Sequence, residues 1–353
     1  MSELGEYIKT KIGGEYFAGD EELDKVEAQI PLLARNRPNR IVIGIIRETI
    51  GPFIDRSTVP DETIGFKIGD GISEKEVIEV PARKFKSKEK IYGIRLCRLY
   101  NVIDKNYRYN SLNNVEQLNN PASGIMGDTV VSGGGDNAGQ GMLPARILYS
   151  NSYSIRDKSL LTERLTHNSL SYNGTMWDNE DGKNRQSLFE TEYIVPGVYF
   201  PSFLTLLDPT PESLIFALSV LSQNSYGAQT SITGSNIKNN VVFLCGCHNE
   251  PAISSYTVSR DWDENESVTR ENIEKYMVNN TEKCLTGSFG LLDGSELSSV
   301  IKRIHNSSFE EIKESFEQLQ GDITALYQYS KFGNKKRNNS RSKGKEEIED
   351  GEI

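Results

Sequence analysis

The chain shows a pattern of short apolar runs separated by polar stretches. The run Ile41–Arg47 (IVIGIIR) is continuous and rich in β-branched residues, which predicts a buried central strand. Similar runs predict strands at Pro144–Tyr149, Val198–Leu207 and Asn240–Cys247.

Helical spacing of apolar residues appears in three other segments. Ser87–Asn101 has a rough apolar side, and Ser87 is in position to cap its N-terminus. Pro211–Gln223 (PESLIFALSVLSQ) opens with Pro-Glu-Ser, which suits a first helical turn. Phe309–Tyr329 is charged and amphipathic.

The order of these elements is strand, helix, strand, strand, helix, strand, with long insertions. It predicts an α+β fold with an RRM-like or ferredoxin-like palm (βαββαβ). We expect an N-terminal extension at 1–39, the palm at 40–250, a helical extension at 251–332 and a disordered tail at 333–353.

Two insertions in the palm have distinct compositions. Residues 110–141 are rich in Asn and Gly and end in SGGGDNAGQG, which predicts a flexible loop. Residues 166–196 are polar and contain a turn signal at 172–175, which predicts a protruding hairpin. Met176 and Trp177 lie beside that turn, where they either wedge between stacked bases or, for Trp177, fold back onto the core.

Charge is segregated along the chain. The net charge of -10 and pI of about 5.1 argue against nucleic-acid binding when taken alone. However, Arg83–Arg108 holds nine Lys and Arg against two acids, whereas the first thirty residues hold eight acids against three Lys. A local basic surface is therefore expected on an acidic protein.

The cysteines predict neither disulfides nor a metal site. Cys97, Cys245, Cys247 and Cys284 are scattered, as in a reduced cytoplasmic protein. Cys245-Gly-Cys247-His248 has the wrong spacing for a zinc knuckle, and VVFLCGCH favours a buried strand. The chain has no signal-peptide pattern and no apolar run long enough to span a bilayer, so no membrane partner is expected.

A basic cluster lies where a predicted strand leads into a predicted helix. Its members are Arg83, Lys84, Lys86, Lys88 and Lys90. Lysines at a helix start oppose the helix dipole, and a bound phosphate backbone would offset that cost. The alternative is an ordinary solvated surface.

The segment Tyr226–Gly234 (YGAQTSITG) lies between a strong helix and a strong strand. Its glycines allow close backbone approach, and its short polar side chains offer hydrogen bonds to sugar, phosphate or base edges. Tyr226 is a candidate for stacking on a base. Residue chemistry alone does not distinguish an RNA-contacting segment from an ordinary polar loop.

Catalytic patterns are sparse. His167, His248 and His305 lie in unrelated contexts, and no HExxH, GxSxG or Walker A motif occurs. Asp128 and Asp136 in the Gly-rich insertion are weak candidates for a nuclease acid.

The run Glu192–Gly234 resembles the backbone subunit of the type I-D CRISPR Cascade surveillance complex, a Cas-seven-type RAMP protein. The matching pieces are Pro196-Gly197, Phe200-Pro201-Ser202, Asp208-Pro209-Thr210 and Tyr226-Gly227-Ala228-Gln229-Thr230. Val80–Lys84 and Arg146–Asp157 give weaker support.

This resemblance implies a palm that binds the guide RNA (crRNA) and oligomerises along it for target DNA pairing, and a thumb hairpin that displaces a base at regular intervals. The implied partners are crRNA, the target DNA strand, further copies of the chain, a large Cas-ten-like subunit, a Cas-five-like cap subunit and small subunits. The expected RNA-binding residues are Arg47, Arg83, Lys84, Lys86, Lys88, Lys90, Arg98, Tyr226, Gly227, Gln229, Thr230, Ser231, Thr233 and Gly234, with Met176 and Trp177 at the thumb tip.

The chain departs from the family pattern in two places. Ile232 stands where members often have Arg, so the charge for RNA binding has to come from Arg83–Lys90. The zinc-binding insertion of some members falls at Met126–Gly141, which has no Cys, so we expect no metal and no cofactor. Two alternatives remain: a backbone subunit that also cuts the paired target through Asp128 or Asp136, and a structural protein without a nucleic-acid role.

Overall fold

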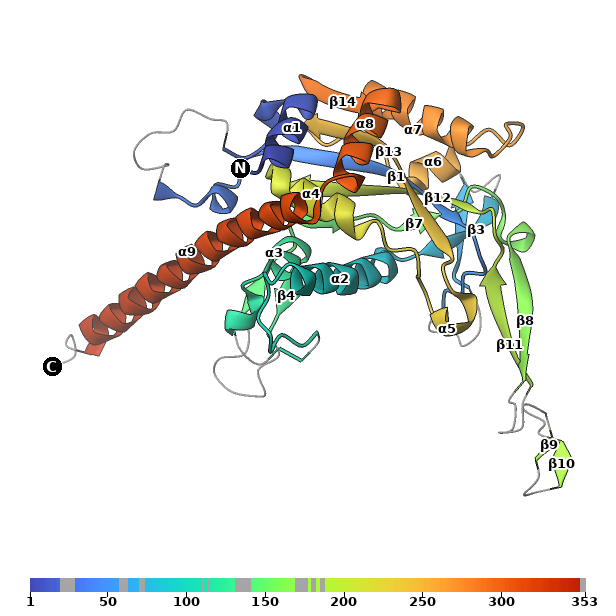
Figure 1. Ribbon diagram of the computed structural model, residues 1–353, viewed down its shortest axis with the longest axis horizontal. Helices are drawn as coiled ribbons and strands as arrows, with labels where there is room; N and C mark the ends of the chain where they lie inside the picture. The colour runs from blue at the N-terminus through green and yellow to red at the C-terminus, as the bar shows by residue number, and fades with distance from the viewer. Residues whose placement is uncertain are drawn as a thin grey trace.

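A five-stranded antiparallel sheet forms the centre of the molecule (Figure 1). In spatial order its strands are β14 (Phe289–Asp293), β13 (Ile237–Cys247), β1 (Arg40–Thr49), β12 (Tyr199–Leu207) and β6 (Ile147–Tyr149). The computed structural model describes residues 1–19, 29–56, 63–69, 74–109, 111–112, 115–130, 141–168, 177–178, 182–184 and 188–349.

Strand β1 is buried on both faces of the sheet. Ile41, Ile43 and Ile45 pack into the larger core, and Val42 and Ile46 pack into a second core on the opposite face. Because successive side chains of a strand point to opposite faces, both sets must be apolar, which accounts for the unbroken run in the sequence.

Helices cover both faces. The larger core lies under α1 (Glu3–Ile12), α2 (Ala82–Leu99), α3 (Pro121–Met126), α4 (Pro211–Val220), α8 (Gly294–His305) and α9 (Phe309–Glu349). The second core lies under α6 (Ser255–Arg260) and α7 (Arg270–Cys284). Within the described residues, no helix is both long and apolar enough to cross a membrane.

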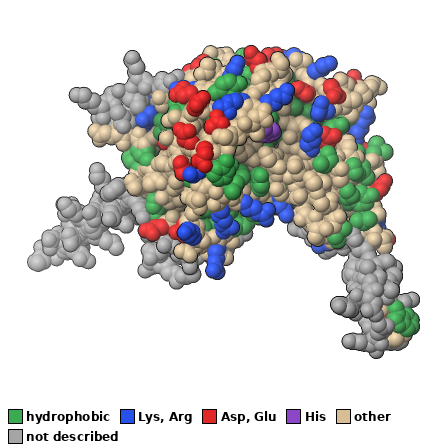
Figure 2. Space-filling model, in the orientation of Figure 1, with side chains coloured by type: hydrophobic (Ala, Val, Ile, Leu, Met, Phe, Trp, Pro, Cys, Tyr) green, Lys and Arg blue, Asp and Glu red, His purple; other side chains and the backbone are tan. Residues whose placement is uncertain are grey.

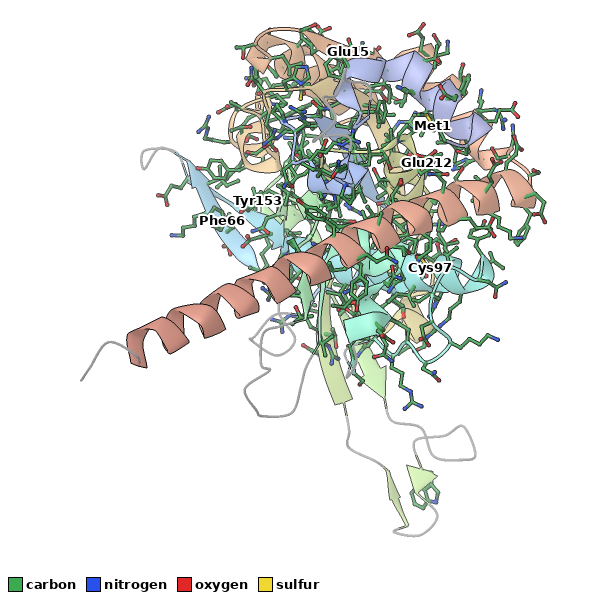
Figure 3. All side chains as sticks on the ribbon, turned by 90° about the vertical axis from the view of Figure 1, so that its left-hand side faces the viewer. Met1, Glu15, Phe66, Cys97, Tyr153 and Glu212 are labelled. Carbon is green, nitrogen blue, oxygen red and sulfur yellow. The ribbon has the colours of Figure 1, made fainter. Side chains whose placement is uncertain are left out.

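Smaller elements surround the sheet. The strands β2 (Gly65–Gly69), β3 (Glu74–Val80) and β7 (Ser152–Tyr153) form a separate sheet, where Phe66 and Tyr153 lie side by side (Figure 3). Strands β8 (Thr162–Asn168) and β11 (Leu188–Ile194) form a hairpin, with β9 (Trp177–Asp178) and β10 (Lys183–Asn184) paired at its far end (Figure 1). The remaining short elements are β4 (Asp128–Thr129), β5 (Met142–Leu143), α5 (Thr230–Thr233) and 3-10 turns at Gly14–Tyr16, Leu32–Ala34, Val115–Leu118 and Lys158–Leu160.

The predicted strands and the predicted central helix are confirmed. Strands β1, β12 and β13 cover the predicted runs, and β6 is shorter than predicted. Helix α4 begins with Pro211 in its first turn, and the Thr210 side chain caps it by accepting a hydrogen bond from Ser213 N. The fold is therefore mixed α and β, as the sequence indicates.

Three segments differ from their predictions. Within the predicted loop 110–141, α3 is buried along its whole length because its small and apolar residues pack against α2 and α9. The extension at 251–332 supplies a strand, β14, to the central sheet. Helix α9 runs from Phe309 to Glu349 and so includes most of the tail predicted to be disordered.

Beside α9, two carboxyl groups approach each other. Glu212 is buried between α1, α4 and α9, where it accepts a hydrogen bond from Ser2 N (Figure 3). Burial, followed by the charge of Glu212, raises the pKa of Asp322 to about 6. The folded state therefore holds a proton on Asp322 at pH values where the unfolded chain has released it.

We expect Asp322→Asn to stabilise the protein at neutral pH. The stability that comes from the raised pKa is present at low pH and is lost as the pH rises through about 6. The gap in unfolding free energy between variant and wild type should thus open between about pH 4 and 6 and level off at roughly 1–3 kcal/mol. Urea unfolding from pH 4 to 8 measures it. Glu317→Gln, an exposed change on the same helix, is the control, and a gap that does not vary with pH would contradict the assignment.

Candidate nucleic-acid interface

Helix α2 starts earlier than the sequence indicates. It begins at Ala82, directly after Pro81, and the Asn151 side chain accepts a hydrogen bond of 2.9 Å from Ala82 N. A residue distant in sequence thus satisfies one of the free N–H groups of the first turn. Ser87, predicted as the cap, lies inside the helix and donates to Lys84 O, so that prediction is wrong.

The basic side chains of α2 divide between two environments. Arg83, Arg95 and Arg98 are exposed, and Lys88 is partly exposed. Arg98 donates to Tyr107 O, which places the loop carrying exposed Lys105 and Arg108 beside the helix. Figure 2 shows Lys and Arg side chains gathered along the lower edge of the body, over α2. We call Arg83, Lys88, Arg95 and Arg98 the outer basic row.

The other three lysines of the predicted cluster have partners inside the protein. Lys90 Nζ lies 3.1 Å from Asp128 Oδ1 and donates to Gly127 O. Lys86 is half-buried over the Tyr149 ring, and burial followed by the charge of Lys90 lowers its pKa. Lys84 Nζ lies 2.6 Å from Asp55 Oδ1. Of the five residues of the predicted cluster, Arg83 and Lys88 thus face solvent, whereas Lys84, Lys86 and Lys90 are held by partners within the protein.

A buried polar network lies behind α2. The guanidinium of Arg47 on β1 lies 2.5 Å from Glu89 Oε1 on α2 and donates to Asn239 Oδ1 on β13. Glu89 also accepts hydrogen bonds from Tyr226 Oη and from Tyr149 Oη. Three elements of the fold, β1, α2 and β6, and the loop after α4 thus meet at one carboxylate, and β13 joins them through Arg47.

Burial and charge reinforce this network. Burial favours the neutral form of Arg47, but the Glu89 carboxylate outweighs it, and the pKa of Arg47 is raised above its usual value. The Arg47 guanidinium also lies over the Phe85 ring, 4.1 Å from the centroid. Burial and then the charge of Glu89 raise the pKa of Tyr226. Arg47 therefore stays charged and Tyr226 stays protonated.

Two predicted RNA contacts are consequently corrected. Arg47 is 1% exposed and Tyr226 is 0% exposed, so neither reaches a phosphate or stacks on a base. The sequence places both beside polar or basic neighbours, but it carries no signal that Glu89, distant from each, occupies the space between them. Their role in this structure is to hold the interface in place from behind.

The remainder of Tyr226–Gly234 does form a surface. Ser231, Ile232 and Gly234 are exposed, and Gln229, Thr230 and Thr233 are partly exposed on the short helix α5. Gly227 has a positive φ of 74°, and a Cβ there would lie 2.3 Å from Ile54 O, so only glycine fits. Together with the outer basic row and the hairpin, α5 frames one side of the molecule (Figure 1).

The hairpin predicted at 166–196 is present. Its β8 and β11 strands pair from Thr162↔Ile194 to Asn168↔Leu188. Trp177 is 49% exposed on β9, so it does not fold back onto the core. Strand β9 pairs with β10, with Lys183 opposite Asp178 and Asn184 opposite Trp177. Met176 and the turn signal at 172–175 lie outside the described residues.

Asp128 is held in a structural contact. Its carboxylate accepts hydrogen bonds from Tyr107 Oη at 2.7 Å and from Ser123 Oγ at 2.9 Å, beside the ion pair with Lys90. This corrects the expectation of an exposed loop acid, because Tyr107, Ser123 of α3 and Lys90 of α2 surround the carboxylate. Asp136 lies outside the described residues. In the described part of the chain, no three His, Cys, Asp or Glu side chains converge as metal ligands.

Sequence reasoning missed several residues of this surface. Arg95 lies seven positions after Lys88, which puts the two on one side of a helix, and this spacing could have identified it. Lys105 and Arg108 follow the helix in a loop, where no periodicity guides the choice. Asp55, the partner of Lys84, gives no local signal.

One of three comparisons with known proteins, the comparison with family models, identifies a family. A family model described as Csc2 Crispr matches residues 71–331. The crystal structure of Thermofilum pendens Csc2 is similar, with a TM-score of 0.57 and 12% identity over 91% of this chain and 98% of that one. A chain of a CRISPR RNA-guided surveillance complex matches with a TM-score of 0.46 and 9% identity, over 82% of this chain and 99% of that one. A search of curated proteins finds no match. At this low identity, the likeness to the crystal structure establishes the fold alone.

We expect Glu89→Gln to lower the free energy of unfolding by about 3–5 kcal/mol, because it leaves the Arg47 charge buried without a counterion. The double variant Arg47→Met, Glu89→Gln should recover part of this loss. Chemical denaturation measures both.

Glu296→Gln, a change at an exposed position of α8, is the matched control and should change the stability by less than about 0.5 kcal/mol. Glu89→Gln behaving like this control would show that the network contributes little.

Proposed function

The chain belongs to the Csc2 Crispr family, and we propose that it is a guide-RNA-binding backbone subunit of a type I-D CRISPR interference complex. Several copies pack along one crRNA and present it for pairing with a target DNA strand. The large Cas-ten-like, cap Cas-five-like and small subunits complete the complex, which works in the cytoplasm.

The arrangement of the central sheet supports an RRM-like palm. Four of its strands lie in the order β13-β1-β12-β6, with α2 following β1 and α4 following β12 along the chain. This is the order expected for a βαββαβ unit in which the first and third strands are central. The fifth strand, β14, adds to one edge.

The outer basic row is the observation that carries the RNA-binding proposal. Its arginines and lysine stand on a helix that is fixed from behind by the Arg47–Glu89 pair. Rigid placement of cations suits a phosphate backbone, which presents charges at regular spacing. The α5 segment adds backbone amides and the short side chains of Thr230, Ser231 and Thr233, which contact RNA without adding charge.

The hairpin is the proposed thumb. It leaves the body on the side that carries α5 and ends in an exposed tryptophan (Figure 1). A large aromatic side chain at the end of a projecting hairpin suits insertion between bases of a single strand. Target cleavage is not part of the proposal, since Asp128 already serves in a buried ion pair.

We expect Lys88→Met and Arg95→Met each to weaken binding of a labelled single-stranded RNA by about 3–10-fold at moderate salt. Each variant should also make the salt dependence less steep, by about 0.7 in the slope of log K against log salt, because one phosphate contact is lost. Fluorescence anisotropy over a salt series measures both quantities.

Lys11→Met on α1 removes an exposed charge away from α2 and is the control. If this variant loses as much affinity and slope as the other two, the attraction is non-specific and the outer basic row is not the contact.

We expect Trp177→Ala to change the pattern of the bound RNA more than its affinity. In wild-type assemblies, one base per copy should be displaced and become reactive toward dimethyl sulfate at regular spacing. The variant should lose this periodicity, because the side chain that separates the bases is absent. Leu160→Ala, which removes an exposed apolar side chain at the hairpin base, should keep it. An unchanged pattern in Trp177→Ala would exclude Trp177 from base displacement.

A further inference from the structure

The short segment Phe53–Arg56 joins the three elements of the proposed RNA surface. Phe53 forms a β-bridge with Ile194 at the base of the hairpin. The carbonyl oxygen of Ile54 accepts a hydrogen bond of 2.9 Å from Ala228 N, at the start of the α5 segment. Asp55 reaches Lys84 in the first turn of α2.

Asp55 holds its lysine from the interior. The residue is 2% exposed, and its carboxylate lies 2.6 Å from Lys84 Nζ. The same ammonium also donates to Arg56 O, and the Lys84 side chain keeps 18% exposure. Lys84 therefore sits at the border between the interior and the surface that bears Arg83 and Lys88, with its charge neutralised from below.

The carboxyl group is poised between two protonation states. Burial raises the pKa of Asp55 to about 6, although the hydrogen bond and charge of Lys84 act in the opposite direction. The other charged groups that act on it are Arg83 of α2, which lowers its pKa, and Glu79 of β3, which raises it. If the Lys84 ammonium moved away, a buried carboxylate would lose its partner, and taking up a proton would be the less costly state.

We propose that Asp55 restrains Lys84 in the free protein, and that a nucleic-acid phosphate displaces it, so that the Lys84 ammonium pairs with the phosphate while Asp55 takes up a proton from solvent. One ion pair is exchanged for another, and the buffer supplies the proton. The idea rests on the proposed RNA-binding function and adds a regulatory residue that does not itself touch RNA.

Two consequences follow for binding. Affinity should rise as the pH falls from about 8 toward 6, since protonation of Asp55 releases Lys84 beforehand. A polyanion that cannot displace Asp55 from Lys84 should contact only the outer basic row and should therefore bind more weakly. Asp55 thus reduces the non-specific binding of other polyanions to the protein.

Isothermal titration of full-length protein with a defined single-stranded RNA tests this. Titrations at pH 7 in phosphate and in Tris, buffers with different ionisation enthalpies, give the number of protons taken up per bound copy. We expect a net uptake of about half to one proton for wild type and none for Asp55→Asn. The variant should also bind about 3–10-fold more tightly at pH 7.5 and lose the pH dependence.

Two lysine variants distinguish a loss of RNA affinity from a loss of proton uptake. Lys84→Met should lose affinity together with the proton uptake, whereas Lys88→Met should lose affinity and keep the uptake. Equal proton uptake by wild type and Asp55→Asn overturns the restraint and leaves RNA binding standing. Absence of RNA binding by the wild-type protein overturns the proposed function itself. Urea unfolding of each variant verifies that the fold is retained.

Discussion

The buried ion pair between Arg47 and Glu89 is the constraint on which the placement of α2 depends. A charged pair at 1% and 0% side-chain exposure is costly to desolvate, and hydrogen bonds to each partner offset part of that cost. The phenols of Tyr149 and Tyr226 donate to Glu89, and the amide oxygen of Asn239 accepts from Arg47, whose Nε is buried without a partner among the described residues. Because these groups come from separate elements, satisfying the pair fixes α2, β6, β13 and the loop after α4 against β1 at the same time.

This constraint gives α2 two functions on opposite sides. Phe85, Glu89, Gly93, Ile94 and Cys97 face inward and set its position, with Gly93 letting the Phe216 ring come close. The outward side carries the three arginines and the lysine of the outer basic row, of which Arg98 also holds the following loop by donating to Tyr107 O. A helix with a firmly fixed back can present charges at constant spacing, which flexible loops do not achieve.

The sequence correctly predicted the elements that depend on a local pattern of residues. The predictions were wrong where contacts with residues distant in sequence determine the structure. Strands β1, β12 and β13 and helix α4 were recognisable from apolar runs and a Pro-containing first turn. Arg47, Tyr226 and Asp128 were predicted to be exposed, but they are held by contacts inside the protein. Whether such a polar residue is buried depends on partners that are distant in sequence. The start of α2 was misplaced for the same reason: Asn151 replaces the cap that the local sequence lacks.

The edges of the central sheet carry a further consequence. The sheet ends in β6, with three residues, on one side and β14, with five, on the other. Long exposed edges would let copies join strand to strand without a template. Because each edge strand is short, a second copy of the chain that paired along one of them would gain few backbone hydrogen bonds.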